Sequence, residues 1–118
     1  MPAPWDAITD PELREHLDTA MFVMVEIGGL DPRRAWNRVD EWNLPQPDWS
    51  ALRRGLWFHH SPVDHGLDLA WGRGWWLLSA LADTVQPRPS VYARYDAALA
   101  DGSWEARKRA AFDTDAAG

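Results

Sequence analysis

The sequence TDPELREHLDTAMFVMVEIGG, at residues 9–29, decides the fold class. Asp10 followed by Pro11 is typical of a helix start, because aspartate caps free backbone N–H groups and proline fits the first helical turn. Apolar residues then recur at steps of three and four, the spacing of one face of an α-helix. The Gly28–Gly29 pair supplies a stop. The stretch therefore predicts an amphipathic helix over residues 11–28.

The same pattern of cap and proline predicts further helices. A second helix begins at Pro32 and ends before Pro45, and a third begins near Asp48. Ser61–Pro62 starts a helix whose apolar spacing continues to about residue 86, with a bend or break possible at its glycines near residue 72. Two shorter helices follow, one capped by Ser90 and one from Trp104 to about Phe112.

These elements predict an all-α fold, an irregular bundle of five to six helices around the long helix near 62–86. We expect one domain over residues 1–112 and a frayed tail over 113–118. The long helix is expected to be central, because apolar residues surround more of its circumference. The expected core comprises Leu17, Met21, Met24, Trp36, Val39, Leu52, Leu67, Trp71, Leu78 and Leu81.

Composition excludes several function classes. The chain has no cysteine, which rules out disulfides, thiolate metal sites and cysteine catalysis. The net charge of -6 repels nucleic-acid phosphates, so we do not expect nucleic acid as a partner, although arginines and tryptophans occur together between residues 33 and 57. No uncharged stretch exceeds nine residues, whereas a membrane span needs about 20. With no secretory signal apparent, we expect a cytoplasmic protein without membrane association.

Tryptophan is the strongest compositional bias, with nine residues of 118. An indole buries on the order of 150–250 Å², so one small core cannot hide all nine. The segment around Gly72 predicts a binding surface formed by Trp71, Arg73, Trp75 and Trp76, in which an arginine lies among aromatic rings. The alternative is helix packing, since Gly66, Ala70 and Gly74 form a stripe of small residues.

A second cluster contains imidazoles and carboxylates. His60, Asp64 and His65 are candidate metal ligands, and His16 on the first helix could join them from across the fold. The alternative is a local role, because an acid is favourable in a first helical turn and a neighbouring histidine can form a surface ion pair. The spacing matches no established metal signature.

Two functions therefore remain open. The first is a non-catalytic interaction module that binds a protein partner or itself through tryptophan-rich surface, such as an adaptor, inhibitor or regulator. The second is a small-molecule or metal-dependent site, lined by tryptophans near His60, Asp64, His65 and Arg73. No sequence motif indicates a catalytic residue or a cofactor, and neither is predicted.

Overall fold

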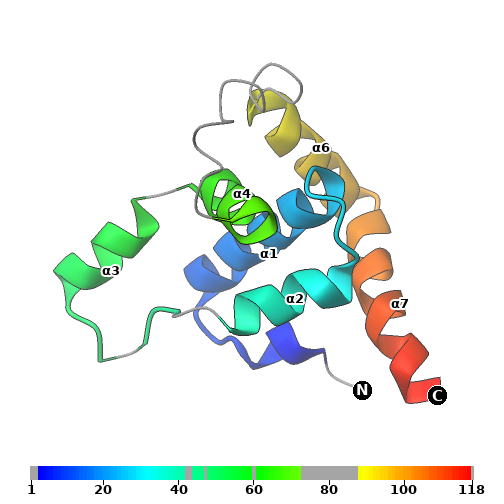
Figure 1. Cartoon of the computed structure of the whole chain (residues 1–118), viewed down its shortest axis with the longest axis horizontal. Coiled ribbons are helices and arrows are strands. Elements are labelled where there is room, and N and C mark those ends of the chain that lie inside the picture. Colours follow the sequence, from blue (N-terminus) through cyan, green and yellow to red (C-terminus); the bar gives the residue numbers. More distant parts are fainter. Residues whose placement is uncertain (1–2, 42–43, 47, 60, 73–87, 118) are drawn as a thin grey trace.

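The computed structural model describes residues 3–41, 44–46, 48–59, 61–72 and 88–117. Within these residues every regular element is helical, which confirms the all-α prediction (Figure 1). None of these helices is both long enough and apolar enough to cross a membrane. The elements are η1 (Pro4–Ala7), α1 (Pro11–Glu26), α2 (Pro32–Asp40), α3 (Ala51–Phe58), α4 (Pro62–Trp71), α6 (Arg88–Ala100) and α7 (Ser103–Ala117).

Side-chain caps fix the starts of four helices. Asp10, Asp31, Ser50 and Ser61 each accept a hydrogen bond from a backbone N–H two or three residues further on. Such caps satisfy donors that the first helical turn leaves free. Because capping is local, the sequence placed these starts to within a few residues. The short η1 at the N-terminus was not predicted.

Helix α1 is the central element, and it packs against α2, α4 and α6 (Figure 1). Its second half is buried on all sides, from Thr19 to Val25. The glycines near residue 72 allowed a bend or break in the helix predicted over 62–86, and the structure shows a break there. Among the described residues the central position belongs to α1, whereas we expected it for the helix near 62–86. Helix α4 ends at Trp71, and Gly72 leaves the helix with a φ of 85°, a conformation that glycine adopts without strain. Residues 73–86 of the predicted long helix lie outside the described residues.

Small residues allow α1 and α4 to approach closely. A Cβ at Gly66 would lie 2.7 Å from the Ala20 carbonyl oxygen and 2.8 Å from the Val23 Cβ, both on α1. At the other end of the contact, a Cβ at Gly28 would lie 2.6 Å from the Ala70 Cβ. The helix-packing interpretation is therefore confirmed for Gly66 and Ala70.

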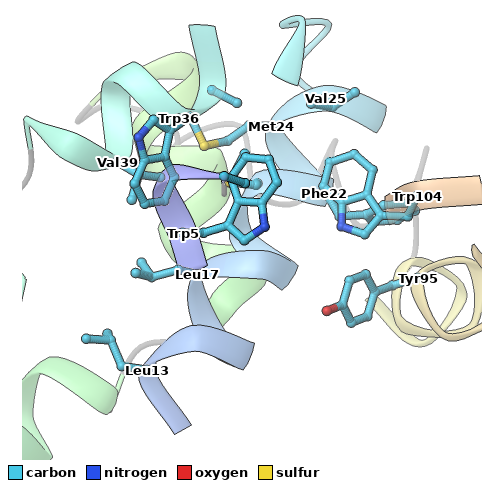
Figure 2. Close-up of a cluster of buried hydrophobic side chains, with 13 residues drawn as sticks. Trp5, Leu13, Leu17, Phe22, Met24, Val25, Trp36, Val39, Tyr95 and Trp104 are labelled. Atoms are coloured by element: carbon cyan, nitrogen blue, oxygen red, sulfur yellow. The ribbon is translucent and has the colours of Figure 1, made fainter. Parts of the chain in front are cut away.

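The core surrounds α1 and differs from prediction at two residues. Figure 2 shows Trp5 beside Trp36, with Phe22, Tyr95 and Trp104 to one side. Leu52 and Trp71 were expected in the core but are 75% and 40% exposed. The expected residues Leu78 and Leu81 lie outside the described part. Six expected core residues are buried, namely Leu17, Met21, Met24, Trp36, Val39 and Leu67.

A polar network joins α1 to the C-terminal helices. Asp18 accepts hydrogen bonds from the Tyr95 hydroxyl (2.6 Å), the Trp104 Nε1 (3.2 Å) and the Lys108 ammonium. Lys108, the only lysine of the chain, is buried and also pairs with Glu105 at 2.9 Å. Burial raises the pKa of Tyr95, so its hydroxyl stays protonated and donates to Asp18.

Helix α7 continues beyond its predicted end near Phe112 and includes residues 113–117, which were expected to fray. Alanines at 110, 111, 116 and 117 favour helix, since alanine has the best helix propensity.

Candidate functional site

The predicted tryptophan-rich surface is described only at one residue. Trp71 occupies the last position of α4 and is exposed. Arg73, Trp75 and Trp76 lie outside the described residues. The C-terminal turn of α4 is held to α2, because Arg38 donates a hydrogen bond to the Leu69 carbonyl oxygen at 2.8 Å. The binding surface around Gly72 therefore stays a prediction.

The predicted histidine cluster is partly assembled. His65 is buried on α4, and its Nδ1 lies 2.7 Å from the Nε2 of His16 on α1. The expected approach of His16 across the fold is confirmed. Asp64 stays half-exposed in the first turn of α4, and His60 lies outside the described residues. Among the residues that the structure describes, no three His, Cys, Asp or Glu side chains converge to hold a metal ion.

Aromatic rings enclose the histidine pair. The ring centroid of Trp57 lies 4.8 Å from that of His16 and 4.7 Å from that of His65, and the Phe58 ring lies 5.3 Å from His16. Burial lowers the pKa of His16 to about 4, against a smaller opposing effect of Glu12. At neutral pH His16 is therefore uncharged and shares a single hydrogen bond with His65.

The histidine pair anchors α3 through one face of that helix. Trp57 and Phe58 contact the imidazoles, and Arg54 pairs with Asp10 at 2.8 Å and with Glu12 at 3.4 Å. With 3.6 residues per turn, the three anchoring side chains of α3 share one side of the helix. This face connects α3 to α1 and α4.

The opposite face of α3 is apolar and exposed. Leu52 and Leu56 are four residues apart and therefore lie roughly 40° apart around the helix axis. They are 75% and 63% exposed. No residue of α3 is buried, and Figure 1 shows this helix set apart from the others.

Gly55 lies on one side of the two exposed leucines, and Arg53 with Trp49 lies on the other. A Cβ at Gly55 would meet no atom within 4 Å, so the helix surface is open there. The Arg53 guanidinium stacks on the Trp49 ring at 3.8 Å from the centroid. We call this exposed surface the α3 face; it consists of Trp49, Leu52, Arg53, Gly55 and Leu56.

Sequence reasoning missed the α3 face, because Leu52 has the spacing of a core residue. One signal was nonetheless present. The segment ALRRGLWF carries leucines on one side and Trp57 with Phe58 on the other, and a single short helix cannot pack both sides against the same body.

A cavity of about 270 Å³ lies between η1, α1, α2, α6 and α7. Its wall includes Trp5, Trp36 and Tyr95, together with the Asp18–Lys108 pair. The charged groups of this pair already satisfy one another, and the Nε1 of Trp5 is buried without a hydrogen-bond partner within the described part of the chain. The Asp18–Lys108 pair in this cavity is therefore part of the structural network.

Comparison of the chain with protein-family models, with curated proteins and with solved structures gives no match.

Proposed function

We propose that this protein is a small, acidic, non-catalytic interaction module that binds a partner protein through the α3 face. The observation that carries the proposal is the exposure of Leu52 and Leu56 on a helix whose other side is anchored. Two large apolar side chains at positions i and i+4 are the pattern by which a helix binds in an apolar groove.

The energetics favour such a contact. Burying a leucine side chain contributes about 1.5–3 kcal/mol relative to leaving it in water. In the isolated chain, Leu52 and Leu56 forgo most of this stabilisation. A partner groove would supply it, and the entropic cost would be small because α3 is already folded and anchored.

The partner is expected to carry an apolar groove with carboxylates at its rim. The α3 helix contains two arginines and no acidic residue, although the chain as a whole is acidic. Arg54 is neutralised by Asp10 and Glu12, whereas Arg53 stays at the edge of the α3 face. A rim carboxylate would pair with Arg53 and orient the helix.

The proposal keeps the interaction function expected from the sequence and moves its centre. The α3 face includes one tryptophan, Trp49, in place of the four-residue surface around Gly72. A protein partner and a cytoplasmic location belong to this proposal, and nucleic acid does not, because the net charge is negative.

Site-specific photo-cross-linking inside the cells that naturally make this protein tests the proposal. A photo-reactive amino acid is placed at Leu56, and in a matched control at Ala106, which is exposed on α7. We expect one discrete partner that cross-links from Leu56 and not from Ala106. The purified partner should then bind the wild-type chain and lose binding to the double variant Leu52→Glu/Leu56→Glu.

Two results would overturn the proposal. The first is equal cross-linking from Leu56 and Ala106. The second is a partner whose affinity is the same for the wild-type chain and for a correctly folded double variant.

A further inference from the structure

A second cavity, of about 260 Å³, lies beside the histidine pair. It is a pocket open to solvent, lined by α1, the end of α3, the start of α4 and α6, so it is separate from the α3 face. Its volume is close to the lower limit for small-molecule sites, which favours a small ligand. Its wall includes Glu12, Glu15, His16, Phe58, Tyr92 and Asp96.

The wall of this cavity carries carboxylates and no lysine or arginine. Glu12 is paired with Arg54 at 3.4 Å. Glu15 and Asp96 come from different helices, and neither has a cationic partner among the residues that the structure describes. A positively charged ligand would therefore be attracted to the carboxylates of Glu15 and Asp96.

An imidazole adds a ring nitrogen to the wall of the cavity. His16 is more than nine-tenths buried, and its Nε2 is bonded to His65. Its Nδ1 has no hydrogen-bond partner within the described residues. When Nε2 donates to His65, Nδ1 carries the lone pair and accepts a hydrogen bond from a ligand. A ligand that donates several hydrogen bonds suits this wall.

Aromatic rings complete the wall. Phe58, Tyr92 and Tyr95 come from two helices, and the hydroxyl of Tyr95 is directed to Asp18 by their 2.6 Å hydrogen bond. Ring faces attract organic cations and also pack against alkyl chains. The rings therefore suit a cationic head attached to a short apolar chain.

We propose that this cavity binds a primary alkylammonium ion. Its three N–H groups would donate to the carboxylates of Glu15 and Asp96 and to the Nδ1 of His16. Its alkyl chain would lie against the rings of Tyr92 and Phe58. This ligand site is independent of the proposed protein-binding function, because it uses none of the residues of the α3 face.

Isothermal titration calorimetry with n-butylammonium chloride tests the proposal on the full chain. We expect saturable binding of n-butylammonium and none of 1-butanol, which has the same chain without the charge. Glu15→Gln and Asp96→Asn should each weaken binding roughly tenfold, as expected for loss of one charged hydrogen bond. Asp40→Asn, an exposed substitution on α2 outside the cavity, should leave the affinity unchanged.

Three results would overturn the proposal. The first is the absence of saturable binding by the folded wild-type chain. The second is equal weakening by Asp40→Asn and Asp96→Asn, which would show long-range attraction alone. The third is equal affinity for tetramethylammonium, which cannot donate the proposed hydrogen bonds. The Leu52→Glu/Leu56→Glu variant should bind n-butylammonium normally, so failure of either proposal is recognised separately.

Discussion

Mild acid should destabilise the fold through His16. Burial lowers the pKa of this histidine from 6.5 to about 4, so the folded chain resists a proton that the unfolded chain accepts. The stabilisation is complete above about pH 6.5, decreases as the pH falls, and is lost below about pH 4. A difference from 6.5 to about 4 corresponds to about 3 kcal/mol, at about 1.4 kcal/mol per pH unit.

The assay is urea unfolding, followed by circular dichroism, between pH 7.5 and pH 4.5, a range chosen to follow most of this loss. His16→Gln removes the titrating group, and His59→Gln, at an exposed position, is the matched control. We expect the wild-type chain and the control to lose stability together as the pH falls, and His16→Gln to lose much less. Equal pH dependence in all three proteins would refute the reasoning about His16.

Three stability predictions follow from the packing, each measured by equilibrium unfolding. Gly66→Ala should cost about 1–3 kcal/mol, because its Cβ would lie 2.7 Å from the Ala20 carbonyl oxygen; a neutral or stabilising result would contradict the close α1–α4 contact. Asp18→Ala should cost about 3–5 kcal/mol, since it removes a carboxylate from the buried Lys108, and a loss below 1 kcal/mol would contradict the network. Leu17→Ala should cost about 2–5 kcal/mol, and no loss would remove it from the core.

Local signals made the helices predictable. The capping residues Asp10, Asp31 and Ser61 bond to their own helices, so their effect is readable from adjacent sequence. The apolar spacing of α1 identified Leu17 and Met21 as core residues for the same reason.

Tertiary context decided what the sequence could not. The glycines near residue 72 left both a bend and a break open, and only the backbone shows that α4 ends at Trp71 with Gly72 at a φ of 85°. Leu52 has core spacing but lies on the side of α3 that faces away from α1. The burial of Lys108 depends on Asp18, ninety positions earlier in the chain, and only the fold brings the two together.

The candidate site was predictable to a similar degree. The sequence identified His65 and suggested that His16 would approach it, and the structure places their ring nitrogens 2.7 Å apart. It did not identify Trp57 and Phe58 as the rings that enclose the pair, because these residues belong to another helix whose orientation is set by Arg54.

The free energy of unfolding of the isolated Leu52→Glu/Leu56→Glu chain tests the central claim most directly. If both leucines point away from the body of the protein, the free energy of unfolding of the variant should lie within about 0.5 kcal/mol of the wild-type value, as is usual for exposed substitutions. A loss of several kcal/mol, comparable to that of Leu17→Ala, would show instead that these leucines stabilise the fold of the lone chain.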